Sequence, residues 1–265
     1  MKQRTIGILF AFFLTASFVA HAAEPQDQRA RPNDPQAVQI LKQAMQRSGL
    51  AANQVTDMQE TGSITYYWAG QEVTGPAKIQ VRGNNQIKVE ADLPEATRYV
   101  TINNGRGSVR QGNRYSELPY HATVNYSVFA RPYFRIAELM NDPGHTISYV
   151  ELMISKDGSF HHLRIDSSPA SAKTAGDSAK LDAIDLYVDA KSLLLVGIET
   201  QAHPIDAITK SIPQCTYFSD YRQVNGSLLP FSITETLGGQ RTWKLELADV
   251  RFNAGLPDSE FNLNF

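Results

Sequence analysis

The sequence has a single cysteine, Cys215, among its 265 residues. No intramolecular disulfide is therefore possible, and stability must come from packing, to which 11 tyrosines and 12 phenylalanines can contribute large buried areas. The formal net charge is only −2, which argues against a nucleic-acid-binding surface or a strongly charged membrane-binding patch. After the N-terminal 22 residues, no apolar run is long enough to span a bilayer, so we expect no membrane span in the mature chain.

The N-terminal 22 residues have the three parts of a secretory signal peptide. Lys2 and Arg4 give a positive start, and residues 6–19 form an uncharged apolar run that a small-x-small cleavage pattern follows. A membrane anchor is the alternative, but a spanning helix needs roughly 20 apolar residues and this run is shorter. We therefore expect a soluble periplasmic protein, cleaved after Ala22 or Ala23. Cleavage after residue 22 leaves 243 residues, and the loss of the two basic residues changes the net charge to −4.

A polar leader and a helix are expected at the start of the mature chain. Residues 23–33 are polar and contain two prolines, which is typical of a disordered segment. Asp34 followed by Pro35 is typical of a helix N-terminus, and Gly49 is typical of a helix end. Apolar residues spaced by three and four predict a helix over residues 35–47 that packs against a sheet through Val38, Leu41 and Met45.

From residue 55 onward the apolar residues recur with a period of two, which predicts β-strands. Two hairpin turns are predicted at Asn225-Gly226 and at Gly238-Gly239. The short strands and intervening turn residues predict an antiparallel meander, and we expect residues 34–265 to form a single, mainly β (α+β) domain. The predicted strands are residues 64–68, 77–82, 87–91, 99–103, 107–110, 146–155, 160–166, 181–188, 194–201, 215–224, 228–237 and 240–250.

A helical insertion interrupts the strand pattern over residues 119–145. Its apolar spacing is helical, Pro132 divides it into two short pieces, and Asp142-Pro143-Gly144 ends the second piece. Short helices are marginal alone, so the insertion must pack on something else. We expect it to form a lid over an apolar cavity, with six residues as lipid-binding or lid residues: Phe129, Tyr133, Phe134, Ile136, Leu139 and Met140.

The sequence carries no recognisable catalytic or cofactor motif. It contains no phosphate loop, dinucleotide fingerprint, nucleophile elbow or zinc-protease motif, so we expect no catalytic residue and no cofactor. His161 and His162 are adjacent on a predicted strand and point to opposite faces, so they do not predict a metal site. Cys215 lies among alternating aromatic residues and is expected to pack rather than react. Three acids on one strand and its turn are expected to lie on solvated faces or to take part in turn hydrogen bonding: Asp182, Asp185 and Asp189.

The C-terminal third resembles the LolA/LolB-like superfamily, which comprises periplasmic lipoprotein carriers, their outer-membrane receptors and related outer-membrane lipoprotein-sorting proteins. The resemblance lies in paired strands, a strand–turn–strand unit and the C-terminal tail: residues 184–189 (IDLYVD) with 194–199 (LLVGIE), 218–226 (FSDYRQVNG) with 229–231 (LPF), and 250–253 (VRFN) with 256–261 (LPDSEF). The resemblance implies an incomplete, strongly curved antiparallel β-barrel with an N-terminal helix and short helices closing its concave side. It also implies a cavity for acyl chains, and it brings no catalytic residues.

Three functions are compatible with these observations. The first is a non-catalytic carrier or binding protein for lipid or lipoprotein acyl chains. The second is an envelope interaction or scaffold protein on the same fold, with a filled core and an envelope protein partner. The third is a hydrolase, which would need a converging polar cluster, and the absence of catalytic motifs makes it the weakest of the three.

Overall fold

The structure, a computed structural model, describes residues 33–50, 54–83, 85–119, 122–123, 125–126, 132–156, 158–167, 183–204, 207 and 210–263. The expected signal peptide and all of the leader except Asn33 lie outside these residues. In chain order the elements are α1 (Pro35–Ser48), β1 (Asp57–Trp68), β2 (Gln71–Arg82), β3 (Gln86–Ala91), β4 (Arg98–Asn103), β5 (Arg106–Gln111), β6 (Arg114–Leu118), α3 (Pro132–Asn141), β7 (His145–Ser155), β8 (Gly158–Ser167), β9 (Ile184–Asp189), β10 (Leu195–Ala202), β11 (Ile212–Val224), β12 (Ser227–Leu237), β13 (Gln240–Phe252) and the 3-10 helix η2 (Asp258–Phe261).

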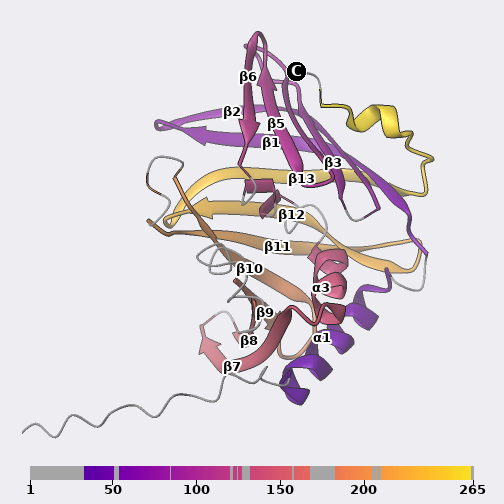
Figure 1. Ribbon diagram of the computed structural model, residues 1–265, viewed down its shortest axis with the longest axis vertical. Coiled ribbons are helices and arrows are strands. Elements are labelled where there is room, and N and C mark those ends of the chain that lie inside the picture. The colour runs from indigo at the N-terminus through magenta and orange to yellow at the C-terminus, as the bar shows by residue number, and fades with distance from the viewer. Residues whose placement is uncertain are drawn as a thin grey trace, which may run out of the picture.

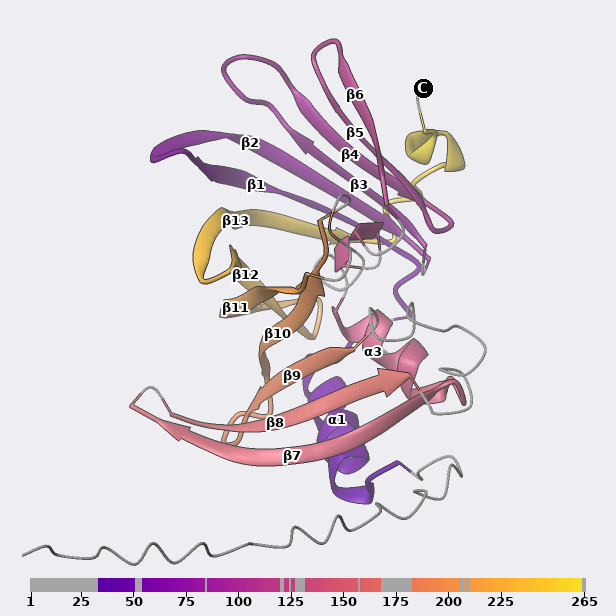
Figure 2. The same ribbon diagram turned by 60° about the vertical axis from the view of Figure 1, so that its left-hand side comes forward.

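The thirteen strands of the described residues form one sheet in the order β6-β5-β4-β3-β2-β1-β13-β12-β11-β10-β9-β8-β7. All neighbours are antiparallel, and β1 and β13 join the two halves of the chain at the middle of the sheet (Figure 1). β6 and β7 are consecutive strands in the chain but lie at opposite ends of the sheet, so the described strands do not close into a barrel. Figure 2 shows the sheet curving between these ends. The expected mainly β, incomplete antiparallel barrel is confirmed.

α1 begins and ends as the sequence predicts. Asp34 Oδ1 accepts hydrogen bonds from the backbone N–H groups of Gln36 and Ala37 at 2.8 and 3.2 Å. Gly49 ends the helix in a left-handed conformation, with φ at 71°. Asp at the N-cap and Gly at the C-terminal cap are residue types that the backbone geometry of helix ends favours.

α1 packs against β7, β12 and α3. Leu41 of the predicted apolar face is fully buried, whereas Val38 and Met45 are half-buried against the core. Two hydrogen bonds connect the residues before the helix to the free edge of β7: Asp34 N donates to Ile147 O, and Ile147 N donates to Asn33 Oδ1. α1 therefore bridges two strands that are well separated in the sheet order, which places it on the concave side.

Both predicted hairpin turns are present. Asn225 and Gly226 link β11 to β12, and Gly238 and Gly239 link β12 to β13, all with positive φ. Asn and Gly tolerate this region of backbone conformation, which other residues avoid. The register of the last three strands therefore follows directly from local sequence.

The concave face of the sheet is apolar and forms the core together with α1 and α3. Alternate residues of most strands contribute to it, as the period of two predicts; on β1 these include Met58 and Ile64. Trp243 on β13 is also buried, but Trp68 at the end of β1 is 79% exposed. Among the described residues, neither α1 nor α3 is long and apolar enough to cross a bilayer.

Candidate functional site

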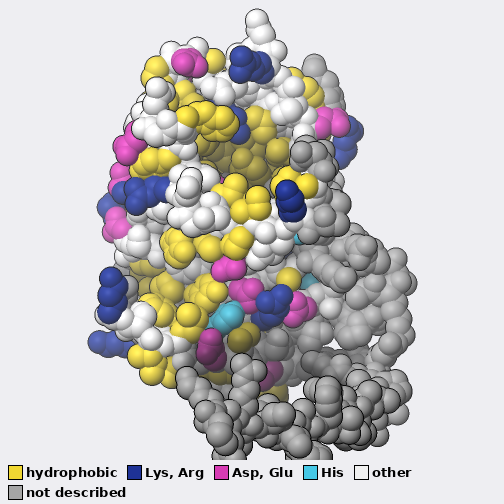
Figure 3. Space-filling view, turned by 90° about the vertical axis from the view of Figure 1, so that its left-hand side faces the viewer, with side chains coloured by type: hydrophobic (Ala, Val, Ile, Leu, Met, Phe, Trp, Pro, Cys, Tyr) yellow, Lys and Arg dark blue, Asp and Glu magenta, His cyan; other side chains and the backbone are white. Residues whose placement is uncertain are grey.

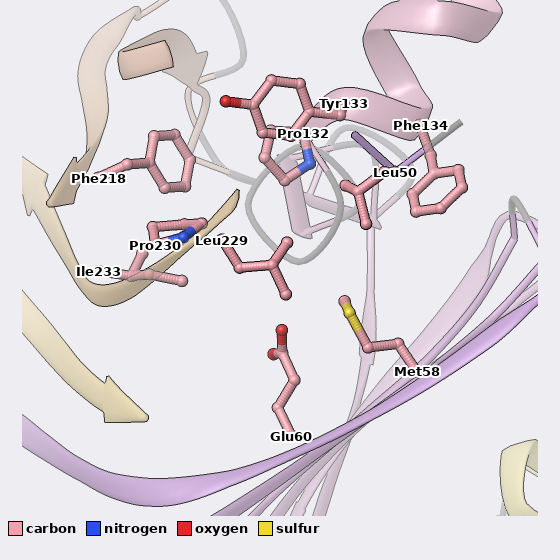
Figure 4. Close-up of a pocket in the computed structure, with 10 residues that line it drawn as sticks. All are labelled: Leu50, Met58, Glu60, Pro132, Tyr133, Phe134, Phe218, Leu229, Pro230 and Ile233. Carbon is pink, nitrogen blue, oxygen red and sulfur yellow. The ribbon is translucent and has the colours of Figure 1, made fainter. Parts of the chain in front are cut away.

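A small cavity lies between the concave face of the sheet and the first turn of α3 (Figure 4). Its volume is about 30 Å³. Five parts of the chain line it: Leu50 after α1, Met58 and Glu60 on β1, Pro132, Tyr133 and Phe134 on α3, Phe218 on β11, and Leu229, Pro230 and Ile233 on β12. Nine of these ten residues are apolar or aromatic, and Glu60 is the exception.

The strand alternation explains why these side chains meet. Phe218 and Ile233 face each other across β11 and β12, and both are buried. Met58 and Glu60 are two apart on β1, so they project from the same face. The first turn of α3 lies over this face and closes the cavity from the side opposite the sheet (Figure 4).

Glu60 is a buried acid in these apolar surroundings. Glu60 is only 7% exposed, and Figure 4 shows its carboxyl group pointing from β1 into the cavity. It makes no hydrogen bond or ion pair within the described part of the chain. Burial alone raises the pKa of Glu60 from 4.5 to about 8, because the ionised form is poorly solvated there. The group is therefore mainly a neutral carboxylic acid at pH 7.

The first turn of α3 is held to the sheet by hydroxyl groups. Tyr133 Oη lies 3.3 Å from Tyr221 Oη and accepts a hydrogen bond from Leu195 N at 3.4 Å. Tyr221 Oη in turn donates to Leu195 O. Burial raises the pKa of both tyrosines, so both hydroxyls stay protonated. These bonds connect α3 to β10 and β11 without any charged group.

A second polar group lies on the concave face, nearer to β4. The Arg98 guanidinium lies 5.7 Å from the centre of the Tyr66 ring and bonds the hydroxyls of Tyr66 and Tyr126. Glu235 nearby is held by Gln214 Nε2 and Thr242 Oγ1, each at 2.7 Å. Burial raises the pKa of Tyr126 to about 12. This group satisfies its acid with neutral donors, in contrast to Glu60.

The six expected lid residues fall into three groups. Tyr133 and Phe134 line the cavity. Ile136 and Leu139 are buried in the core, and Met140 is half-buried against it, so these three anchor α3 rather than line the cavity. Phe129 lies outside the described residues.

Glu60 was not among the expected site residues. The signal for it is an acid in the core-facing phase of a strand, between Met58 and Ile64. Such an acid either pairs with a basic residue or marks a special environment. The sequence gives no way to choose, because the residues that surround Glu60 come from distant parts of the chain.

The outer face of β8 to β11 carries a row of polar contacts. Asp185 is 8% exposed and accepts from Arg164 Nη1 at 3.1 Å, and its Oδ1 lies 2.8 Å from His162 Nε2. The expectation of a solvated Asp185 is therefore wrong, because His162 and Arg164 on the next strand cover it. Cys215 is half-buried beside Glu199, and burial together with this acid raises the pKa of its thiol. In the part of the chain that the structure describes, no three His, Cys, Asp or Glu side chains are grouped to hold a metal.

Solved structures of other proteins share this architecture. An outer-membrane lipoprotein-sorting protein domain from Vibrio parahaemolyticus is similar over 86% of this chain and 96% of its own, with a TM-score of 0.54 and 9% identity. A LolA superfamily protein from Nitrosomonas europaea is similar over 86% and 97%, with a TM-score of 0.55 and 13% identity. A DUF1329 family protein from Desulfovibrio piger is similar over 85% and 97%, with a TM-score of 0.55 and 11% identity.

The fold of this chain is therefore LolA-like, as the resemblance in the C-terminal third implies. No protein-family model matches the sequence, and no curated protein matches it either. Identities of 9–13% show the fold alone. Function has to be argued from the residues of the site.

Proposed function

We propose that this protein is a periplasmic, non-catalytic carrier that holds the acyl chain of a lipid or lipoprotein inside its curved sheet. The proposal rests mainly on which elements cover the concave face of the sheet. Helices cover this apolar face, one of them on the connection between the two edge strands, and no second sheet lies over it among the described elements. The LolA-like fold supports the proposal, because the similar domain from Vibrio parahaemolyticus is described as an outer-membrane lipoprotein-sorting domain. The expected signal peptide supports the periplasmic location.

The cavity is too small for an acyl chain while α3 stays in place. Its volume is about 30 Å³, whereas ligand pockets are commonly about 300–1,000 Å³. An acyl chain must therefore displace Tyr133 and Phe134, which fill the space between the start of α3 and the sheet. Burial of the chain contributes roughly 0.8 kcal/mol per methylene, which offsets the lost contacts of these two side chains.

α3 has the properties that such a lid requires. It is 10 residues long, and helices of this length depend on their packing for stability. The six proposed lid and lipid-binding residues are those expected from the sequence: Phe129, Tyr133, Phe134, Ile136, Leu139 and Met140. Hydrophobic side chains also gather in the hollow in the upper half of the face shown in Figure 3, which gives a chain apolar surface beyond the small cavity.

A second candidate is an envelope interaction protein with a permanently filled core. The small volume of the cavity favours it, because the concave face is already covered in this conformation. In that case α3 is an ordinary core helix, and no lipid is extracted with the protein. The two candidates differ in whether α3 leaves the sheet.

Binding of a fluorescent acyl ester to the purified mature protein tests the carrier. Tyr133→Phe keeps the aromatic ring but removes the hydroxyl bonds of α3 and leaves Leu195 N without this acceptor. We therefore expect faster binding, together with a loss of about 1–3 kcal/mol of stability. Phe134→Ala removes a cavity wall, so we expect weaker binding. Leu152→Ala, at a 46% exposed position of β7, is the control and should bind like the wild type. If the wild type shows no saturable binding, the carrier proposal is refuted and the envelope interaction protein becomes the favoured candidate.

Native mass spectrometry of protein purified from the periplasm provides a second test. A carrier should retain a lipid that organic extraction releases. A protein that is consistently free of lipid, and whose α3 amides exchange as slowly as the core strands, would contradict the lid.

A further inference from the structure

The unpaired acid in the cavity carries an inference about the cargo. Glu60 is 7% exposed, points into the space between the sheet and α3, and has no hydrogen-bond partner within the described part of the chain (Figure 4). A buried polar group without a partner destabilises the folded state. Glu235, a half-buried acid of the concave face, has two neutral donors of its own. Glu60 therefore differs from an ordinary core acid in having a hydrogen-bonding capacity that a ligand can satisfy.

We infer that Glu60 donates a hydrogen bond to an uncharged carbonyl of the cargo, the ester or amide that links an acyl chain to the rest of the molecule. The inference rests on the proposed function, since it concerns the ligand of the same hollow. It adds selectivity: the protein takes acyl esters or amides in preference to free fatty-acid anions.

The protonation state of Glu60 supports a donor role. Its pKa is raised to about 8 by burial, so at neutral pH the group is mainly a carboxylic acid with one O–H donor. An ester or amide carbonyl is an acceptor with no hydrogen to donate from its oxygen, which matches that O–H. Met58 and Leu229 line the cavity next to the carboxyl group, so an acyl chain beside it would contact apolar walls.

The lining also argues against charged ligands. None of the ten lining residues is Lys, Arg or His, so a buried fatty-acid carboxylate would have no cation to pair with. Tyr133 is the other titratable group of the lining, and burial raises its pKa, so it adds no charge either. An ammonium ligand would require Glu60 to ionise in the same apolar space, which its burial opposes.

Three ligands of equal chain length distinguish these chemistries: monolauroylglycerol as the ester, laurate as the anion and dodecylamine as the cation. Binding to the mature protein is measured by calorimetry at about pH 6.5 and about pH 9.5, on either side of the Glu60 pKa of about 8. We expect the ester to bind roughly tenfold more tightly than laurate at the lower pH and to lose roughly this factor at the higher pH, as one hydrogen bond is lost.

Variants of Glu60 test the role of the side chain itself. Glu60→Gln keeps an N–H donor, so it should bind the ester within about threefold of the wild type at both pH values, without the pH dependence. Glu60→Leu should lose roughly tenfold in ester affinity while it keeps its affinity for laurate. Glu199→Gln, on the outer face of β10, is the matched control and should behave like the wild type.

The outcomes separate this inference from the proposed function. If the wild type binds none of the three ligands, the carrier itself is refuted. If it binds the ester and laurate equally, and Glu60→Leu changes neither, the carrier stands and the role of Glu60 is refuted. Tightest binding of dodecylamine, lost in Glu60→Gln, would overturn the inference in favour of a cation site.

Discussion

Replacement of Glu60 by Gln should make the protein more stable, increasingly so as the pH rises. Gln has nearly the same shape as Glu, and like a protonated Glu it is a neutral polar group, so both place a similar group in the cavity at low pH. They differ once the carboxyl group can ionise. In the folded protein burial holds the pKa of Glu60 at about 8, whereas the group has its ordinary value of 4.5 in the unfolded chain.

The sign and size of the effect follow from proton linkage. Between pH 4.5 and about pH 8 the folded protein keeps a proton on Glu60 that the unfolded chain has lost, so wild-type stability falls as the pH rises. Each pH unit corresponds to 1.36 kcal/mol, so the difference between the two pKa values corresponds to roughly 5 kcal/mol in total and roughly 3 kcal/mol by pH 7. This is a large part of the ~5–15 kcal/mol that stabilises a typical domain.

Urea denaturation followed by the fluorescence of the buried Trp243 measures the effect. We expect wild type and Glu60→Gln to unfold at similar urea concentrations near pH 4.5, and the variant to gain several kcal/mol by about pH 8. Subtraction of the wild-type curve removes the contributions of other titrating groups. Glu199→Gln should show no such gain. A constant difference between Glu60→Gln and wild type over this range would refute the reasoning, because Glu60 would then be ionised in the folded protein.

Three further substitutions test the packing that surrounds the site, each by urea denaturation. Gly62→Ala should destabilise by about 3 kcal/mol or more, because its Cβ would lie 2.1 Å from Glu246 O of β13; Ser63→Ala next to it should change little. Leu139→Ala should destabilise by about 2–5 kcal/mol, since the side chain is 2% exposed, and a value below about 1 kcal/mol would mean that α3 is not anchored as described. Asp34→Ala should destabilise by about 1 kcal/mol by removing the α1 N-cap, and an unchanged midpoint would contradict that role.

Local sequence patterns predict most of the individual elements. The cap residues and apolar spacing predict α1 to within one residue, and the Asn225-Gly226 and Gly238-Gly239 turns predict the register of the last three strands. The sequence pattern does not predict β6, because this edge strand has no apolar face to produce alternation; residues 114–117 are all exposed. The pattern does not predict the early part of β2 either, since Gln71 and Glu72 are exposed.

The candidate site depends on contacts that local patterns do not contain. The pairing of β1 with β13 brings Met58 opposite Phe252, and no turn or spacing specifies such a distant partner. The cavity likewise joins side chains from residue 50 to residue 233. The sequence predicts that residues 119–145 pack on an apolar surface, and it identifies Tyr133 and Phe134 among the candidates. Only the assembled sheet shows that these two line the same cavity as Glu60, whereas Leu139 does not line it.

The order of strands explains why the proposed lid lies where it does. β6 and β7 follow each other in the chain but lie at opposite ends of the sheet, so the connection that holds α3 must lead from one end to the other. At its C-terminal end α3 is tied closely to β7: Asp142 accepts a hydrogen bond from Gly144 N, and its other carboxyl oxygen lies 2.8 Å from His145 Nδ1. At its N-terminal end Tyr133 is held to β10 and β11 by neutral hydroxyl bonds. We therefore expect an opening of α3 to pivot at residues 142–145. Hydrogen exchange with and without bound acyl ester should then change at the first turn of α3 more than at its last turn.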